Sequence, residues 1–276
     1  MKNRPIGIFD SGVGGLTVFS QIEKELPNEN IIYFGDTLRV PYGPRPLEEV
    51  RLFVFNIIEF LKSQKVKLIV VACNTGTAAA LTEAQQMFDI PIVGVIEPGA
   101  RGAVMATKNR KVGVIGTKGT INSRAYSHAV RAFDAGVTVY SASCPKLVEI
   151  VEKGLVSNAN FYNTSSYTVA KGYLTPILRA HIDTLILGCT HYPLLKGMLT
   201  KVCGNNIEII SSAEETAVEV RMILERKGQL RTDKSLPKPR FVSSGDTQAF
   251  KLIGSRFLGR EINGVEKNIL DQEMVT

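Results

Sequence analysis

The sequence has no tryptophan, only four cysteines and only three histidines among its 276 residues. Four cysteines without a Cys-x-x-Cys pair do not form the disulfide framework of a small secreted domain. His128, His181 and His191 lack the spacing of zinc ligands. The sequence therefore predicts neither a disulfide scaffold nor a metal site.

Long hydrophobic runs are also absent. No stretch of about 18 uncharged apolar residues occurs that would span a bilayer. The N-terminal MKNRPIGIFD passes from a short polar start directly into an apolar run, without the apolar core and small-residue cleavage site of a signal peptide. We therefore expect a cytoplasmic protein with no membrane partner.

The charge is unevenly spread. The net charge is +7, and residues 221–240 alone hold seven basic and two acidic residues, a net +5. Such a stretch is either a solvated helix end and loop or a surface for an anionic partner such as nucleic acid. No nucleic-acid-binding motif accompanies it.

Hydrophobic residues make up 44% of the chain, and strand-like runs alternate with helix-like ones. The apolar runs at 5–10, 30–36, 66–73 and 91–96 have the length of strands. Segments 16–27, 46–64 and 75–88 have helical periodicity. This alternation predicts a parallel sheet with helices on both faces.

The pattern then restarts. Segment 111–133 parallels 5–26, and HIDTLILGCTHYPLLKGML parallels KVKLIVVACNTGTAAALTE. Pro and Gly punctuate a join near 97–104, and the chain after 207 is too short for its own core. We therefore predict two similar doubly wound α/β domains, 1–98 with 207–276 and 99–206, with the active site in the cleft between them.

Two cysteines occupy matching positions in the two halves. Cys73 and Cys189 each end an apolar strand and precede residues that begin a helix, where ligands of parallel sheets bind. Helix-terminal N–H groups lower a thiol pKa, and we expect this for both residues. Cys144 and Cys203 are interpreted as buried structural thiols.

One thiol in each half suggests two bases on opposite sides of one carbon atom. One base removes a proton from one face while the other returns a proton to the opposite face, which inverts the stereocentre. A Cys–His hydrolase is the competing chemistry, but it requires only one nucleophile and an oxyanion hole.

Seven segments resemble the motifs of the glutamate racemase family, in chain order and from end to end. They are GIFDSGVGGLTV (7–18), GDTLRVPYG (35–43), VACNTGTA (71–78), VGVIGTKGTINS (112–123), CPKLVEIVEKG (144–154), DTLILGCTHYPLL (183–195) and FVSSGD (241–246). The wider superfamily includes aspartate racemase, hydantoin racemase and arylmalonate decarboxylase. Cys-Thr-His at 189–191 is typical of the glutamate enzyme, whereas aspartate racemases usually carry Cys-Thr-Glu.

The resemblance implies a cofactor-independent isomerase that interconverts L- and D-glutamate and supplies D-glutamate for bacterial peptidoglycan. It implies that Cys73 deprotonates D-glutamate and Cys189 deprotonates L-glutamate. Asp10 and His191 would assist proton transfer, and Glu152 would act on the side of Cys189. The alternatives are a helix cap for Asp10, a structural histidine for His191 and a solvated helix residue for Glu152.

The resemblance also implies a substrate-binding set. Its members are Asp10, Ser11, Tyr42, Gly43, Asn74, Thr75, Thr190 and His191, and Thr117 and Thr120 open the equivalent turn of the second half. Backbone N–H groups and hydroxyls at helix N-termini bind carboxylates well. Gly76 and Thr77 depart from the Ala-Ser that is common in the family, and Leu38 stands where Ala is common.

Other functions stay open. A related racemase, above all aspartate racemase, and a cysteine-dependent decarboxylase are the enzymatic alternatives, although the decarboxylases typically keep one of the two cysteines. Some glutamate racemases also bind DNA gyrase, and residues 221–240 would be the surface for such a role. The resemblance further implies a homodimer, while some relatives behave as monomers and some are activated by a cell-wall precursor.

Overall fold

A computed structural model describes residues 1–154, 165–233 and 235–270 of the chain. Contacts divide the chain into two compact units, Met1–Val95 with Ala213–Thr276 and Ile96–Ser212. Each unit contains a parallel sheet flanked by helices, so the predicted α/β class with two similar parallel-sheet domains is confirmed. Residues 155–164 and 271–276, which fall within the two predicted domains, lie outside the described residues.

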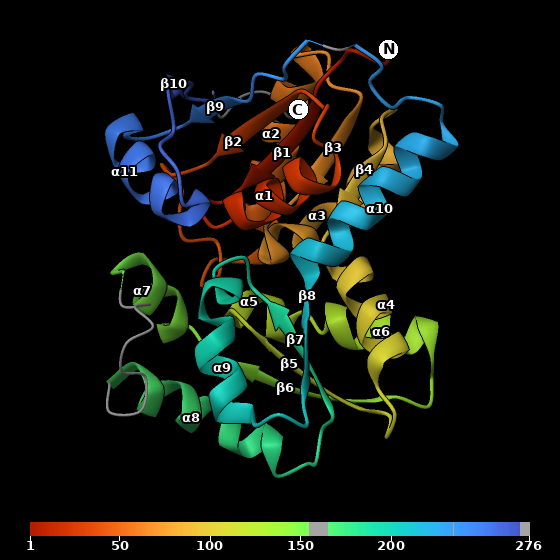
Figure 1. Ribbon diagram of the computed structural model, residues 1–276, viewed down its shortest axis with the longest axis vertical. Helices are drawn as coiled ribbons and strands as arrows, with labels where there is room; N and C mark the ends of the chain where they lie inside the picture. The colour runs from red at the N-terminus through yellow and green to blue at the C-terminus, as the bar shows by residue number, and fades with distance from the viewer. Residues whose placement is uncertain (155–164, 234, 271–276) are drawn as a thin grey trace. The chain divides into compact units, whose positions relative to one another are not determined.

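The sheet of the first unit has the order β10-β9-β2-β1-β3-β4 among the described strands, and all its neighbours are parallel (Figure 1). Its strands are β1 (Ile6–Asp10), β2 (Ile31–Gly35), β3 (Leu68–Val71), β4 (Ile92–Gly94), β9 (Arg240–Ser243) and β10 (Glu266–Lys267). The C-terminal segment therefore returns to complete this sheet, because β9 pairs with β2.

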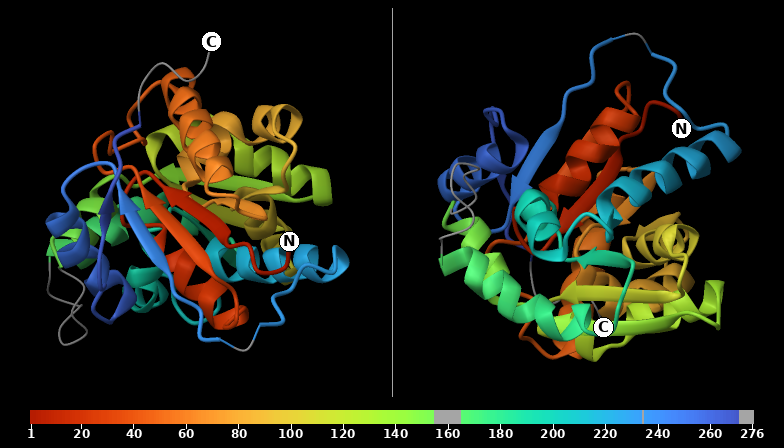
Figure 2. Two further views of the ribbon diagram at one scale, coloured as in Figure 1. Left: turned by 90° about the horizontal axis from the view of Figure 1, so that it is seen from above. Right: turned by 60° about the horizontal axis from the view of Figure 1, so that its bottom comes forward.

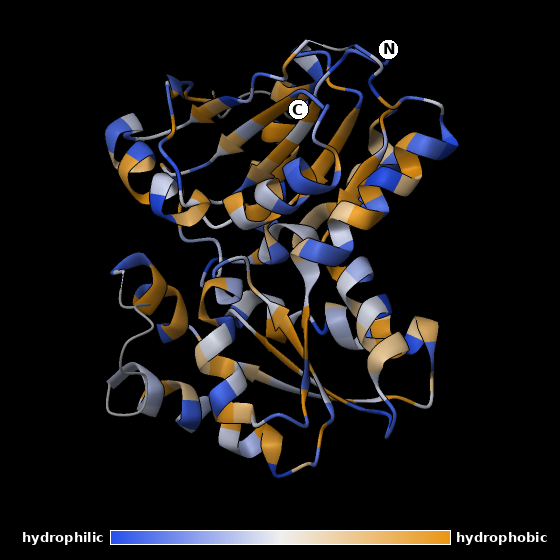
Figure 3. Ribbon diagram, in the orientation of Figure 1, coloured by the Kyte–Doolittle hydropathy of each residue, from blue (hydrophilic) through white to orange (hydrophobic). Residues whose placement is uncertain are grey.

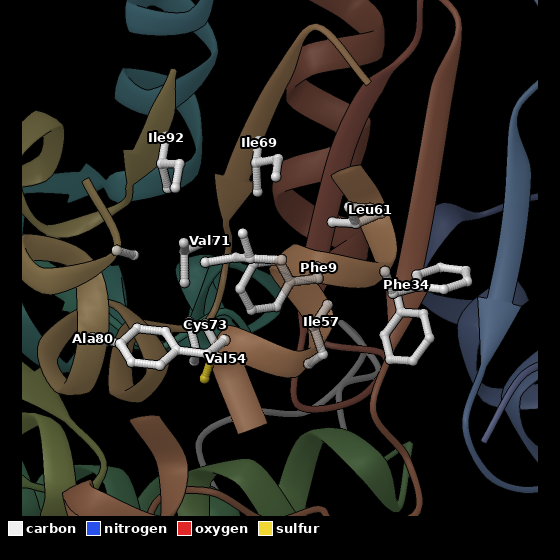
Figure 4. Close-up of a cluster of buried hydrophobic side chains, with 14 of the residues drawn as sticks. Phe9, Phe34, Val54, Ile57, Leu61, Ile69, Val71, Cys73, Ala80 and Ile92 are labelled. Carbon is white, nitrogen blue, oxygen red and sulfur yellow. The ribbon is translucent and has the colours of Figure 1, made fainter. Parts of the chain in front are cut away.

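Helices cover both faces of this sheet, which explains why its central strands are almost wholly apolar (Figures 2 and 3). On one face, Phe9, Phe34 and Val71 pack in a cluster with α2 (Leu47–Ser63) and α3 (Asn74–Met87) (Figure 4). On the other face, Tyr33 contacts Phe19 of α1 (Leu16–Glu25) and Phe250 of α11 (Thr247–Leu258). The remaining described helix of this unit is α10 (Ser212–Arg226), which belongs to it from Ala213 onward.

The sheet of the second unit has the order β6-β5-β7-β8, again with parallel neighbours. Its strands are β5 (Lys111–Gly116), β6 (Thr138–Ser143), β7 (Thr184–Gly188) and β8 (Glu208–Ser211). The described helices are α4 (Ile96–Ala106), α5 (Lys118–Asn122), α6 (Ala125–Phe133), α7 (Lys146–Glu152), α8 (Ser165–Leu178) and α9 (Lys196–Cys203). A 3-10 helix, Tyr192–Leu195, precedes α9.

Close approaches at two glycines show that this sheet also has helices on both faces. A Cβ on Gly188 of β7 would meet the Tyr126 ring of α6 at 2.9 Å. A Cβ on Gly113 of β5 would instead meet Ile182, which precedes β7, at 2.5 Å and Ile177 of α8 at 3.0 Å. Glycine therefore lets a helix approach the strands closely on each face.

The strand order of each sheet reverses at one point. In the first unit the chain leaves β1 toward β2 and returns to β3 on the other side of β1. In the second unit it leaves β5 toward β6 and returns to β7 on the other side of β5. Loops diverge at such a switch point and leave room for a ligand at the carboxyl ends of the strands. Residue 73 follows β3 and residue 189 follows β7, so each thiol lies at a switch point.

Two details differ from the sequence-based expectation. The prediction assigns residues 207–276 to the first domain, but β8 (Glu208–Ser211) pairs with β7 in the second sheet. The join near 97–104 is a continuous helix, α4. Pro98 is tolerated there because it lies in the first helical turn, where backbone N–H groups need no partner within the helix. No described helix is long and apolar enough to cross a membrane.

Candidate active site

Cys73 is the N-cap residue of α3. Its Sγ atom accepts a hydrogen bond from the backbone N–H of Gly76 at 3.4 Å, and it lies 3.8 Å from Oγ of Ser11. The thiol itself therefore caps the helix. The side chain is only 6% exposed and joins the apolar cluster of β1, β2 and α2 (Figure 4).

Burial determines the ionisation of Cys73. Desolvation raises the pKa of its thiol well above the ordinary value, and the nearby Asp10 carboxylate raises it further. Hydrogen bonds from Gly76 and Ser11 oppose this rise without cancelling it. The expected lowering of the Cys73 pKa is therefore wrong, because the loss of water outweighs the helix-terminal donors.

Asp10 ends β1 beside Cys73 and is 1% exposed. Its Oδ2 atom accepts hydrogen bonds from the backbone N–H groups of Gly12 and Gly15, both at 3.1 Å. A Cβ on Gly15 would lie 2.5 Å from the Cβ of Asp10 and 2.8 Å from the hydroxyl of Tyr33. The glycine-rich turn 12–15 thus folds tightly around the carboxylate, and one oxygen of Asp10 organises this turn.

The helix start after Cys73 brings the other predicted residues to the same end of the sheet. Asn74 and Thr75 form the first turn of α3 and are 3% and 2% exposed. Thr77 donates a hydrogen bond from its hydroxyl to the carbonyl oxygen of Val71 at 3.0 Å, and this hydroxyl accepts one from the N–H of Val95 at 3.4 Å. Thr77 therefore ties the helix to the ends of β3 and β4.

Tyr42 and Gly43 lie in the loop between β2 and α2. The Tyr42 side chain is 1% exposed, and its hydroxyl donates a hydrogen bond to Oδ2 of Asp36. The phenol O–H is bonded within the protein and the side chain is buried, which favours the main chain of Tyr42 as the part that meets a ligand. Sequence reasoning did not identify Asp36, although the residue lies within the quoted segment GDTLRVPYG.

Cys189 has a different environment in the second unit. Its Sγ atom lies 3.9 Å from Nδ1 of His191, and the hydroxyl of Thr190 lies 3.5 Å from the same nitrogen. All three residues are 6% exposed. They directly follow β7, and the 3-10 helix begins at Tyr192.

Glu152 ends α7 and contacts the histidine. Its Oε1 atom lies 3.1 Å from Nε2 of His191, and its side chain is 42% exposed. The three side chains Cys189, His191 and Glu152 therefore form a continuous polar chain from a buried thiol to a partly exposed carboxylate. Such a chain can move a proton between the thiol and solvent.

A third cysteine lies close to Cys189. Cys144 is fully buried after β6, and burial together with the neighbouring Cys189 raises the pKa of its thiol to about 12. Its carbonyl oxygen accepts a hydrogen bond from the hydroxyl of Tyr192 at 2.9 Å. Cys144 thus stays protonated and supports the residue next to His191, in line with its interpretation as a structural thiol.

Thr117 and Thr120 lie across the second switch point, after β5. Their hydroxyls are 3.2 Å apart, and Thr120 is 1% exposed. Elsewhere, no three His, Cys, Asp or Glu side chains gather as metal ligands would among the described residues.

Several cations of the basic stretch 221–240 have partners within the protein. Arg221 pairs with Glu25 and Glu225, and Arg240 pairs with Glu266. Arg231 is 7% exposed and donates to the carbonyl oxygens of residues 28 and 235. These arginines attach the C-terminal segment to its own unit; Lys234 lies outside the described residues. Binding of gyrase or nucleic acid stays an untested prediction.

The chain resembles known proteins over nearly its whole length. The family described as Asp/Glu/Hydantoin racemase matches residues 6–220. A glutamate racemase of Exiguobacterium sibiricum is 49% identical, covering 93% of this chain and 93% of that protein.

Solved structures agree with this likeness. A glutamate racemase isoform of Bacillus anthracis has a TM-score of 0.92 at 48% identity, covering 97% of this chain and 98% of that one. The glutamate racemase of Francisella tularensis, solved in complex with D-glutamate, has a TM-score of 0.90 at 36% identity, covering 98% and 99%.

Proposed function

This chain belongs to the Asp/Glu/Hydantoin racemase family and is an amino-acid racemase, an isomerase, and from that premise we propose that it interconverts L- and D-glutamate with two cysteine bases. The observation that carries this proposal is the placement of two buried thiols, Cys73 and Cys189, at the switch points of two similar parallel sheets. The relatives named above support glutamate as the substrate.

The proposed reaction divides the proton transfers between the thiols. With D-glutamate, the thiolate of Cys73 removes the α-proton, and the thiol of Cys189 donates a proton to the opposite face of the resulting carbanion. With L-glutamate, the two residues exchange roles. The D-to-L reaction leaves Cys73 as the thiol and Cys189 as the thiolate, which is the pair that L-glutamate needs. Exchange of these two protons with solvent restores the starting pair, so only protons move and no cofactor takes part.

Substrate charge resolves a difficulty at Cys73. Burial and Asp10 raise the pKa of this thiol, which disfavours the thiolate that the reaction needs. The ammonium group of bound glutamate brings a positive charge close to the α-carbon and stabilises a thiolate beside it. Gly76 and Ser11 already offer donors to the sulfur. We infer that substrate binding itself favours the thiolate form of Cys73.

The flanking side chains have distinct proposed roles. Asp10 holds the turn beside Cys73 and assists proton transfer there, while His191 and Glu152 do so at Cys189. The carboxylates and the ammonium would be bound by three kinds of group. These are the first helical turn at Asn74 and Thr75, the hydroxyls of Ser11 and Thr190, and the main chain of Tyr42 and Gly43. These groups supply fixed dipoles without a competing cation.

D-Glutamate made in this way would supply peptidoglycan synthesis. The predicted cytoplasmic location, the homodimer and a cleft between the domains stay predictions.

The test follows L-glutamate and, separately, D-glutamate by circular dichroism in deuterated buffer. Wild-type protein should bring either enantiomer to a racemate that carries deuterium at the α-carbon. Cys73→Ser and Cys189→Ser should each slow this at least about a hundredfold, since each removes one of the two bases. Cys203→Ser is the matched control, because Cys203 ends α9 away from the thiol chemistry, and it should keep wild-type activity.

Three outcomes would contradict parts of the proposal. Aspartate racemising in place of glutamate would retain the mechanism and overturn the substrate. A single cysteine substitution without effect would overturn the two-base mechanism. A wild-type protein that leaves both amino acids optically pure would overturn the function as a whole.

A further inference from the structure

The loop that carries Tyr42 and Gly43 connects β2 to α2 without a helix or strand of its own. Backbone hydrogen bonds hold parts of this loop, such as Arg39 N–H to Asp36 and Arg45 N–H to Tyr42, and side-chain contacts add to them. The central one is Asp36, whose carboxylate is completely buried. We define the Asp36 cluster as Asp36, Arg39, Tyr42 and Ser244.

Both oxygens of Asp36 are used within this cluster. Oδ2 accepts hydrogen bonds from Nε of Arg39 at 2.7 Å and from the hydroxyl of Tyr42. Oδ1 accepts a hydrogen bond from the hydroxyl of Ser244 at 2.8 Å. Hydrogen bonds to an ionised carboxylate are stronger than those between neutral groups, so the cluster holds the Tyr42 ring firmly.

Ser244 also binds the loop directly. Its hydroxyl accepts a hydrogen bond from the backbone N–H of Leu38 at 2.9 Å, while it donates to Asp36. One buried hydroxyl, 2% exposed, thus bridges the start of the loop and the carboxylate that holds Tyr42.

Ser244 comes from a distant part of the chain, 206 residues after Leu38. It directly follows β9, which pairs with β2, and its own N–H donates to the carbonyl oxygen of Gly35 at 3.1 Å. Beside it, the hydroxyls of Ser243 and Thr37 are 2.7 Å apart, and the N–H of Gly245 donates to Thr37 at 3.0 Å. The end of β9 is therefore hydrogen-bonded to the start of the loop at several points.

We propose that Ser244 is a positioning residue for substrate binding, because its hydroxyl fixes Leu38 and Asp36, and Asp36 in turn fixes Tyr42. The main chain of Tyr42 and Gly43 is then held in place before glutamate arrives. The proposal rests on the proposed function, in which this main chain contacts the substrate. The C-terminal segment thereby takes part in binding without touching the ligand.

The test compares Ser244→Ala with Ser255→Ala. Ser244→Ala removes both hydrogen bonds of the bridge, and KM for both enantiomers should rise about tenfold, as expected from the loss of buried hydrogen bonds, while kcat changes far less. Ser255 is a matched control: its hydroxyl accepts one hydrogen bond from the N–H of Ile262 at 3.0 Å, outside the loop. Ser255→Ala should leave KM unchanged.

Amide hydrogen exchange gives a second readout that needs no activity. The Leu38 N–H should exchange faster in Ser244→Ala than in wild type or in Ser255→Ala, because its acceptor is gone. If wild-type protein does not racemise glutamate, the proposed function fails, and Leu38 exchange alone then decides whether Ser244 fixes the loop. A wild-type KM in Ser244→Ala overturns the proposal even if Leu38 exchanges faster.

If Ser244→Ala does not fold, Tyr42→Phe is a second variant that tests the Asp36 cluster. It removes the Tyr42 donor to Asp36 without changing β9, and KM should again rise, whereas an unchanged KM overturns the proposal. Where both variants fold, their combination should raise KM less than the product of the two single effects, since both act through Asp36. Fully independent effects would contradict a shared cluster.

Discussion

The surroundings of Cys73 and Cys189 differ although both thiols are 6% exposed and both follow a central strand. Cys73 caps a 14-residue helix and is surrounded by a backbone donor, the Ser11 hydroxyl and the Asp10 carboxylate. Cys189 precedes only a 3-10 helix and has an imidazole beside it, which leads to a partly exposed carboxylate. Cys73 is therefore surrounded by groups within its own unit's core, whereas Cys189 is connected through His191 to a partly exposed carboxylate that can exchange protons with solvent.

This difference between the two thiols must appear in the individual proton-transfer steps. It does not appear in the ratio of kcat/KM for L-glutamate to kcat/KM for D-glutamate. L- and D-glutamate are mirror images with equal free energy, so kcat/KM must be the same in both directions at every pH. The two half-sites can still differ in which proton transfer is slower. Isotope effects on the two substrates are therefore the measurement that distinguishes them.

The largest expected effect comes from His191→Asn and its counterpart Asp10→Asn. Each should lower kcat by about a hundredfold, the usual contribution of a positioned acid or base. In His191→Asn, transfer at Cys189 becomes the slow step. The isotope effect should therefore grow with α-deuterated L-glutamate and shrink with α-deuterated D-glutamate.

Asp10→Asn should reverse this pattern, because it slows transfer at Cys73. His128→Asn is the control, since His128 lies on the exposed side of α6, and it should behave as wild type. Identical isotope patterns in His191→Asn and Asp10→Asn would show that the two half-sites do not divide the proton transfers.

A medium effect concerns stability at alkaline pH. Burial holds the folded-state pKa of Cys73 far above its ordinary value of 9.0, so above pH 9.0 the unfolded chain loses this proton while the folded protein keeps it. The free energy of unfolding should then fall by about 1.4 kcal/mol per pH unit for this thiol. The contribution is complete below pH 9.0 and is lost as pH rises.

Urea unfolding of reduced protein at a series of pH values checks this. Cys73→Ser should show a shallower fall above pH 9.0 than wild type, because serine does not ionise. Cys203→Ser offers a comparison: burial raises the pKa of Cys203 only to about 11, so its effect should end near that pH. Parallel curves for Cys73→Ser and wild type would contradict the burial argument.

The sequence predicted the fold class and the two thiols because both depend on local patterns. Alternating strands and helices identify parallel sheets, and the repeated strand-Cys context identifies the strand ends. The partner of a short strand is not encoded locally, so β8 was assigned to the wrong sheet. The direction of the Cys73 pKa was missed because the depth of burial depends on Val54, Phe9 and other residues brought together only by folding.

Contacts between distant residues explain what else was missed. Ser244 was quoted within FVSSGD, but nothing in that segment indicates Asp36 as its partner. Tyr42 was expected to bind substrate, and only the fold reveals that its hydroxyl donates a hydrogen bond to Asp36. Glu152 was proposed from a family motif, and the structure brings it to 3.1 Å from His191, which spacing alone does not predict.

The smallest expected effect compares the helices that follow the two thiols. Gly76 lies in the first turn of α3, and Gly197 lies in the first turn of α9, after the 3-10 helix that follows Cys189. A Cβ on Gly197 would meet nothing within 4 Å, so Gly197→Ala should stabilise the protein by about 0.5–1 kcal/mol and leave racemisation unchanged.

Gly76→Ala should behave differently, because its Cβ would lie 3.3 Å from both the Cβ of Cys73 and Cγ2 of Val54. The gain in helix propensity is then offset by a small displacement of Cys73, and kcat should fall several-fold at nearly unchanged stability. Thermal unfolding and racemisation of both variants measure the pair. Equal stabilisation and full activity in both would mean that Cys73 can shift by a few tenths of an ångström without losing the proton, so its half-site would be no more rigid than that of Cys189.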